Sequence, residues 1–250
     1  MSGHYIAWVT MTTFSHKQSL QVAYILHSRP YRDNSLIVEI FSREHGRVAA
    51  VAKGAKQPKS KFQGLLQPFG LLLLSWVGQN DLMTLVDAES QQSILKLSGK
   101  KLVSGFYINE LLIRLLQKHD PHQQLFDMYH ETLQALAEGK PEEPTLRRFE
   151  CQLLQETGYG LILDHDVDTG EIIKADAQYC YHIEYGPVKV STRTQDGLVI
   201  YGSTLIALQE QNITGVEQLK QAKQLMRAII AHQLDGKPLR SRELAMQKVL

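Results

Sequence analysis

The sequence predicts an α+β fold in which a small five-stranded barrel precedes a mainly helical region with a small β-hairpin insertion. Short apolar segments of strand-like composition fill residues 21–88, and Gly, Pro, Asn and Asp residues separate them at hairpin spacing. After Gly99 the apolar residues recur at helical spacing. With 250 residues, 43% of them apolar, the chain can bury a core in each region.

Five strands are predicted before residue 90, and the two clearest turns between them are Ser28–Asn34 and Gly78–Asp81. Five short strands in so few residues favour a closed barrel of the OB type, although an SH3-like barrel would give a similar pattern. An OB-fold commonly presents one strand face and its loops to nucleic acid or saccharide. The predicted strands are 21–27, 35–41, 47–52, 71–77 and 82–88.

A lysine-rich segment separates the third and fourth predicted strands. Its four lysines lie among small residues, one Pro and Phe62, and no acidic residue interrupts them. Ammonium groups in such a loop stay in water or meet an anion, and an interleaved aromatic ring suits a base that stacks. A solvated surface loop is the alternative interpretation. The lysines are Lys53, Lys56, Lys59 and Lys61.

The net charge of +1 conceals an uneven distribution. Residues 1–64 carry a net charge of +6, residues 65–219 of −10 and residues 220–250 of +5. Basic ends around an acidic middle indicate an anionic partner that the ends contact. Attraction between the ends and the middle of the chain itself is the alternative.

The helical region is predicted to begin with three antiparallel helices at 104–118, 123–138 and 145–157, whose apolar stripes form a core. A small hairpin is expected around Gly186-Pro187, within 179–191. Helices at 204–209 and 215–234 follow, and a basic turn leads into a last short helix. We therefore expect three regions, a flexible extension over 1–19, a barrel domain over 20–95 and a helical domain over 96–250.

The motifs of common enzymes are missing from the sequence. It contains no Walker-type loop, no GxGxxG, no GxSxG and no HExxH.

Asp164–Gly170 resembles the start of a calcium loop, but its glycine comes one residue late and Ala175 stands where the bidentate Glu belongs. A two-metal nuclease site there is the alternative, and an acidic surface loop is favoured. Cys151 and Cys180 form no CxxC. We expect a binding protein with no cofactor or metal, rather than an enzyme.

Several motifs, taken in order, resemble the RecO family of bacterial recombination mediators. The resemblance covers about Gln21 to Leu244 and leaves residues 1–19 outside. The six motifs are Tyr24-Ile25-Leu26-His27-Ser28-Arg29-Pro30-Tyr31, the run from Gly46-Arg47-Val48 to Val51-Ala52-Lys53-Gly54-Ala55, Leu66-Gln67-Pro68-Phe69, Tyr107-Ile108-Asn109-Glu110-Leu111-Leu112, Leu146-Arg147-Arg148-Phe149-Glu150 and Gly236-Lys237-Pro238-Leu239-Arg240-Ser241-Arg242.

The resemblance implies an OB-fold followed by a helical domain, in a cytoplasmic, nucleoid-associated protein. It implies binding of single- and double-stranded DNA and annealing of complementary strands. It also implies work with RecR to load RecA onto DNA coated by single-stranded-DNA-binding protein (SSB). An adaptor that binds proteins, with incidental DNA binding, is the alternative. Some relatives carry a four-cysteine zinc site that this sequence lacks.

Two sets of site residues follow from these predictions. The first is a DNA interface, with cations for phosphates and two rings for bases: Arg29, Arg32, Arg43, Arg47, Lys53, Lys56, Lys59, Lys61, Tyr31, Phe62, Lys237, Arg240 and Arg242. The second is an apolar pocket with a rim cation for the acidic, Phe-ending tail of SSB, which the resemblance implies: Ile108, Leu112, Arg114, Leu115, Leu116, Lys118, Phe126 and Tyr129, with Arg148 nearby.

Overall fold

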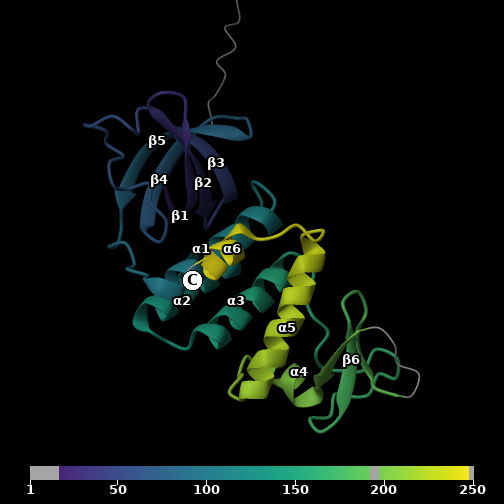
Figure 1. Ribbon diagram of the computed structural model, residues 1–250. Helices are drawn as coiled ribbons and strands as arrows, with labels where there is room; N and C mark the ends of the chain where they lie inside the picture. Colours follow the sequence, from purple (N-terminus) through teal and green to yellow (C-terminus); the bar gives the residue numbers. More distant parts are fainter. Residues whose placement is uncertain (1–16, 192–196, 248–250) are drawn as a thin grey trace, which may run out of the picture.

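The polypeptide forms three parts that follow one another along the sequence (Figure 1). The computed structural model describes residues 17–191 and 197–247. A five-stranded barrel comes first, three helices pack against it, and a small sheet with further helices follows. The predicted α+β fold is confirmed. Most of the predicted extension, residues 1–16, lies outside the described residues.

The barrel closes because β3 and β5 pair in parallel, with Ala49 opposite Leu82. Every other pairing in the barrel is antiparallel, and the strand order is β1-β2-β3-β5-β4. This is the arrangement expected of an OB-type barrel. The strands are β1 (Lys17–Tyr31), β2 (Ser35–Ser42), β3 (Gly46–Ala52), β4 (Leu71–Val77) and β5 (Leu82–Ser90).

β1 extends beyond both ends of the strand predicted at 21–27. Its first half pairs with β4, where Lys17 lies opposite Val77, and its second half pairs with β2, where Tyr31 lies opposite Ser35. Register shifts interrupt both pairings, so the two-residue period of a strand is not visible in the sequence. Residues 28–31, predicted as a turn, therefore belong to the strand.

The first three helices match the predicted apolar stripes. α2 has the predicted bounds and ends at Gly139, whose φ of +86° is the left-handed conformation that glycine adopts readily. α1 begins at Gly99 rather than Ser104, because Lys100 and Lys101 mask the apolar period of its first turn. The helices are α1 (Gly99–Leu115), α2 (Gln123–Glu138) and α3 (Glu142–Glu156).

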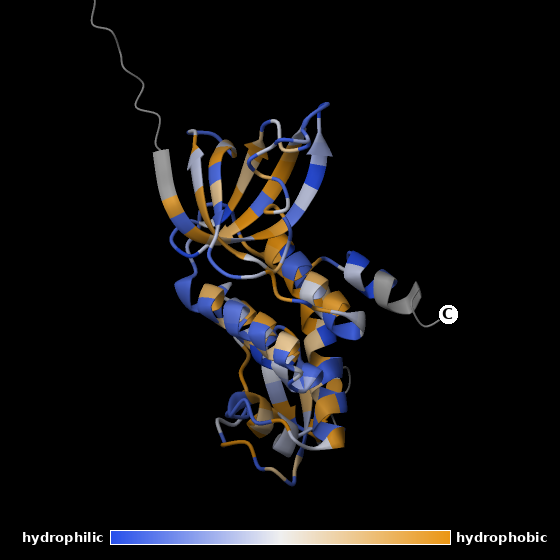
Figure 2. Ribbon diagram, turned by 90° about the vertical axis from the view of Figure 1, so that its left-hand side faces the viewer, coloured by the Kyte–Doolittle hydropathy of each residue, from blue (hydrophilic) through white to orange (hydrophobic). Residues whose placement is uncertain are grey.

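One core joins the barrel to these helices. Tyr24 and Phe41 project from β1 and β2 onto α2, with ring centroids 5.0 Å from Tyr129 and 5.4 Å from Phe126, respectively. Figure 2 shows apolar residues, in orange, alternating with polar ones along the strands. Fully buried aromatic rings at this junction fix the position of the helices relative to the barrel.

The third part is a sheet of order β7-β6-β8, so the predicted hairpin has a third strand that the prediction missed. α4 and α5 cover this sheet, and α6 returns to pack on α1. None of the helices in the described ranges combines the length and apolar content that a membrane span requires. The elements are β6 (Gln178–His182), β7 (Gly186–Lys189), β8 (Leu198–Tyr201), α4 (Gly202–Gln209), α5 (Val216–Gln233) and α6 (Arg240–Gln247).

Candidate nucleic-acid interface and cationic pocket

The lysine loop, residues 53–64, leaves β3 as a series of tight turns. Backbone hydrogen bonds run from Gln57 N to Gly54 O and from Ser60 N to Gln57 O, so the loop has a defined path. All four of its lysines are exposed, as predicted for charges that cannot be buried.

The lysine loop packs against the hairpin between β1 and β2. Lys56 donates its backbone N–H to Asn34 O and its ammonium group to Asp33 O, each at about 3 Å. The guanidinium of Arg32 lies 5.1 Å from the centre of the Tyr31 ring, a cation–π contact. The structure therefore places the loop lysines and the predicted hairpin residues at one end of the barrel.

Phe62 does not face solvent, and its predicted role in base stacking is wrong. Its side chain is 4% exposed and packs inside the barrel beside Leu66. The loop after β3 thus inserts these two apolar side chains into the barrel core. Tyr31 is half-buried and is the one ring of the predicted pair that remains accessible.

Arg43 and Arg47 lie at the other end of β2 and are engaged within the chain. Arg43 contacts the Asp127 carboxylate of α2 at 2.9 Å. Arg47 pairs with Glu39 at 3.0 Å and donates to Leu116 O at 3.2 Å. Both arginines connect the barrel to the helices or brace its strands, so we remove them from the DNA interface.

The tail pocket predicted on α1 and α2 is wrong because its apolar residues form the core. Their stripes face one another and the barrel within one buried cluster. Arg114 donates to Pro238 O at 2.6 Å, and exposed Arg148 lies 3.6 Å from Glu131. Leu115 is half-buried against the same core, and Lys118 is exposed. The fully or almost fully buried residues are Ile108, Leu112, Leu116, Phe126 and Tyr129.

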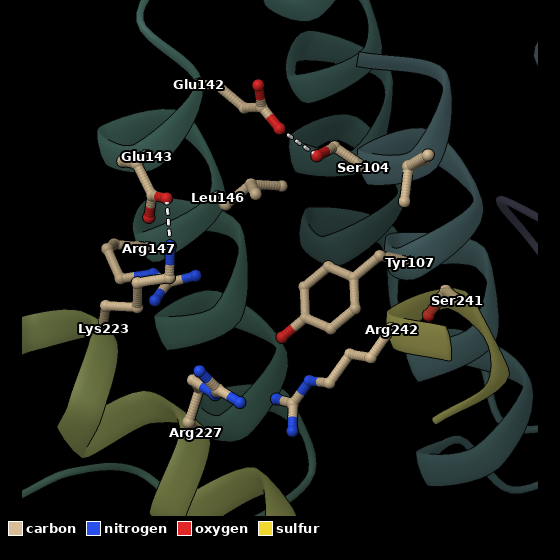
Figure 3. A pocket seen from close by; sticks show the side chains of 11 residues that line it. Ser104, Tyr107, Glu142, Glu143, Leu146, Arg147, Lys223, Arg227, Ser241 and Arg242 are labelled. Atoms are coloured by element: carbon tan, nitrogen blue, oxygen red, sulfur yellow. Dashed lines mark hydrogen bonds and ion pairs between the residues drawn. The ribbon is translucent and has the colours of Figure 1, made fainter. Parts of the chain in front are cut away.

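A different cavity, here called the cationic pocket, lies between α1, α3, α5 and α6 (Figure 3). Its volume is about 520 Å³, and apolar groups and charged groups share its wall. The combination suits a ligand that carries both an apolar group and negative charge. The lining residues are Val103, Ser104, Tyr107, Glu142, Glu143, Leu146, Arg147, Lys223, Arg227, Ser241 and Arg242.

Beneath the pocket lies a buried charge pair. Arg147 donates from Nη2 to Glu150 Oε1 at 2.6 Å, and the Tyr107 hydroxyl donates to the same oxygen at 2.7 Å. Burial raises the pKa of Glu150 above the usual value of a glutamate, and Arg147 opposes this shift. Nε and Nη1 of Arg147 are buried without a hydrogen-bond partner in the described structure. A buried guanidinium with unsatisfied donors is suited to an incoming carboxylate.

Further cations surround the mouth of the pocket. Lys223 contacts Glu143 at 2.6 Å, and Ser104 donates to Glu142. The guanidinium of Arg242 lies 5.9 Å from the centre of the Tyr107 ring. Arg227 projects from the exposed face of α5 toward the same space (Figure 3).

The predicted C-terminal cations belong to the segment that docks on α1. Glu110 of α1 accepts hydrogen bonds from the backbone N–H groups of Arg240 and Ser241, at 3.0 and 2.9 Å. Burial alone would raise the pKa of Glu110, but these hydrogen bonds lower it below its usual value. Arg242 therefore lines the pocket, while Lys237 and Arg240 stay exposed beside it.

The two basic ends of the sequence thus serve different regions. The end of the barrel near the β2–β3 turn touches the helical part, where the backbones of Arg47 and Lys118 form an isolated parallel β-bridge. The lysine loop and the β1–β2 hairpin lie at the opposite end of β2, roughly 25 Å away for an eight-residue strand.

Asp164–Gly170 forms a turn around a buried carboxylate. Asp166 is 2% exposed and accepts backbone N–H groups from Asp168, Thr169 and Lys189. Asp164 and Asp168 point to solvent, as an acidic surface loop predicts. Within the described ranges, no three His, Cys, Asp or Glu residues are grouped as metal ligands.

Comparison with known proteins agrees with this architecture. Residues 17–94 match the family described as Recombination protein O N terminal, and residues 97–243 match Recombination protein O C terminal. The protein named DNA repair protein RecO from Nitrosospira multiformis is 47% identical over 235 residues, covering 94% of this chain and 97% of its own length. Its namesake from Azoarcus sp. is 45% identical over 230 residues, covering 91% and 95%. The chain belongs to the RecO family.

In RecO-family terms, the lysine loop lies in the N-terminal domain and the cationic pocket in the C-terminal domain. The resemblance inferred from six motifs is therefore confirmed, and with it a role in DNA repair. Sequence reasoning missed Lys223 and Arg227 as pocket residues. Their only signal was spacing by four on α5, which is equally typical of a solvated helix face.

Proposed function

We propose that this protein is a non-enzymatic recombination mediator. It binds single- and double-stranded DNA and anneals complementary strands. With RecR, it helps to load RecA onto single strands coated by SSB, at the nucleoid in the cytoplasm. The observation that best supports DNA binding is that exposed cations of the lysine loop and the β1–β2 hairpin lie together with the accessible ring of Tyr31. They do so at the end of the barrel that Phe62 and Leu66 fill.

Residues 20–95 act as the DNA-binding domain in this proposal. The loop lysines contact phosphates together with Arg29 and Arg32, and Tyr31 stacks on a base. Only Lys61 has an ion pair in the described structure, a 3.5 Å contact with exposed Asp87 that water and salt weaken. Phosphate contacts carry no base information, so any two complementary strands can be held and annealed.

Residues 96–250 act as the partner-binding domain, and the cationic pocket receives the acidic, Phe-ending tail of SSB. The unsatisfied Nε and Nη1 of Arg147 would bind the terminal carboxylate. Val103, Tyr107 and Leu146 offer apolar surface to the phenylalanine ring. Rim cations attract the acidic residues that precede it. This placement replaces the one predicted on α1 and α2.

Strand annealing tests the proposal. Complementary oligonucleotides, one labelled with a donor dye and one with an acceptor, are coated with SSB and mixed with the protein without ATP. The wild type should anneal them, and the fourfold Lys→Glu variant at 53, 56, 59 and 61 should not. The matched control reverses four exposed lysines of the helical domain, Lys140, Lys174, Lys189 and Lys220, and should retain annealing.

An adaptor that binds repair proteins without needing its own DNA contacts is the second candidate, and the cationic pocket favours it. The same assay separates the two. If neither the wild type nor the loop variant anneals the strands while both still bind the SSB tail, the adaptor function stands and the loop is a solvated surface. If only the loop variant fails while it still binds the SSB tail, the mediator function stands.

A further inference from the structure

The cationic pocket contains carboxylates of its own. Glu142 and Glu143 come from the first turn of α3 and lie on the pocket wall, together with four basic side chains. A site built only to attract an acidic ligand gains nothing from acids at its rim, because like charges repel. The contacts of these two acids therefore bear on how the pocket works.

Glu143 reaches across the mouth of the pocket to Lys223. The ammonium nitrogen and carboxylate oxygen are 2.6 Å apart and join α3 to α5 (Figure 3). Both side chains are accessible, with 40% of the Glu143 side chain and 47% of the Lys223 side chain exposed. An ion pair this exposed is weak and exchanges readily.

The other basic groups of the pocket are held differently. Arg147 pairs with Glu150 beneath the pocket, and both side chains are buried. A ligand carboxylate that displaced Glu150 would leave the Glu150 charge buried without its partner, which is strongly unfavourable. Arg242 lies over the Tyr107 ring. Arg227 forms no ion pair with any of the described residues. Lys223 is thus the rim cation that an acid of the same pocket occupies.

We infer that Glu143 is an internal competitor, which occupies Lys223 and lowers the affinity of the pocket for acidic ligands. An incoming carboxylate must displace Glu143 from Lys223 before it gains that contact. Glu142 is held by the Ser104 hydroxyl on α1, pairs with no cation within the described ranges, and adds to the negative field of the pocket. The identity of the ligand rests on the function proposed above.

Competition of this kind sets specificity as well as affinity. A ligand with a single carboxylate reaches Arg147 and leaves the Glu143–Lys223 pair intact. A ligand with further carboxylates can contact Lys223 only when the Glu143–Lys223 ion pair breaks. Loss of that ion pair offsets part of the binding free energy from the new contact. The pocket therefore binds its acidic partner reversibly, which suits a protein that must release SSB while strands anneal.

A double-mutant cycle tests the inference. The probe is a fluorescein-labelled peptide with several aspartates before a C-terminal phenylalanine, measured by fluorescence anisotropy with the full chain. The variants are Glu143→Gln, Lys223→Met and the two combined. Glu138→Gln is the control, because Glu138 is an exposed acid of the same domain that does not line the pocket and pairs with Lys140.

Glu143→Gln should tighten binding about fivefold at low salt, and Lys223→Met should weaken it by a similar factor. In the Lys223→Met background the Glu143→Gln gain should disappear, and Glu138→Gln should bind as the wild type does. Thermal unfolding of each variant verifies that the fold is kept.

Three results would overturn the inference. The first is unchanged or weaker binding by Glu143→Gln while the wild type binds the peptide. The second is an equal gain with and without Lys223, which would assign the effect to the general negative field. The third is no binding by the wild type or by Glu143→Gln, in which case the proposed tail site fails as well.

Discussion

The lysine loop and the cationic pocket are both basic, but they present their charge in opposite ways. The loop exposes four lysine side chains while backbone hydrogen bonds define its path, and the two side-chain contacts described above, from Lys56 and Lys61, are made at the surface. The pocket buries a guanidinium to 5% side-chain exposure and positions it with a carboxylate beneath. One region can follow a surface of many shapes, and the other is built for a single geometry.

In the proposed function, this difference separates the general binding of DNA from the specific binding of a peptide end. A nucleic acid is a repeating polyanion, so mobile charges in water suffice, and the affinity falls steeply with salt. A peptide end offers one carboxylate and one ring, so donors must be held in place before the ligand arrives. A substitution in one region should therefore change the affinity for one ligand and leave the affinity for the other unchanged.

The largest effect is expected from reversing the loop charges. Lys→Glu changes at 53, 56, 59 and 61 should weaken binding of a single-stranded oligonucleotide about 100-fold or more at low salt, for all sequences alike. If about five phosphates are neutralised, the wild-type log K should fall with log salt at a slope of roughly −3.5. Fluorescence anisotropy measures both quantities. A slope near zero would contradict the electrostatic account, and binding of the acidic peptide should not change.

The next effect tests the pocket alone. Arg227→Ala combined with Arg242→Ala should weaken binding of the acidic, Phe-ending peptide about 10- to 30-fold, since two rim cations are lost. DNA affinity should stay within about twofold in the same assay, because Arg242 lines the pocket and lies on α6, away from the lysine loop. A comparable loss of DNA affinity would instead place Arg242 in the DNA interface, as the sequence predicts.

The two predicted stacking rings should now behave differently. Tyr31→Ala should reduce single-strand affinity about 5- to 30-fold, the loss of one stacked base at ~1–2 kcal/mol. Phe62→Leu should leave DNA affinity unchanged and lower the unfolding midpoint in urea, because the side chain fills the barrel interior. If Phe62→Leu lost DNA affinity at unchanged stability, the ring would have to turn outward in the complex.

The smallest effect concerns the docking of α6 at the pocket. Glu110→Gln should lower the free energy of unfolding by about 1 kcal/mol at neutral pH, since charge-assisted hydrogen bonds become neutral ones. The folded-state pKa of Glu110 is below its usual value, so this stabilisation is complete above the unfolded-state pKa. It disappears as pH falls through the folded-state pKa. Urea unfolding at successively lower pH should show the wild type and variant converging.

Local signals were sufficient to predict most of the fold. The two-residue period with turn residues located the strands β2 to β5, and the apolar stripes located α1 to α3, because both patterns depend on neighbours close in sequence. The long β1 was underestimated since it changes partner along its length. β8 was missed because its four residues lie outside the β6–β7 hairpin and reach β6 through a longer connection.

The sequence alone determined that the loop lysines face water, because no run of unpaired ammonium groups can be buried. It also determined the family, through motifs that keep their order along the chain. Only the tertiary structure decided that Phe62 turns inward and that Arg43 and Arg47 have carboxylate partners within the chain. The cationic pocket draws on α1, α3, α5 and α6, and its residues become neighbours only when these helices pack, so spacing along the chain does not distinguish it from a solvated helix face.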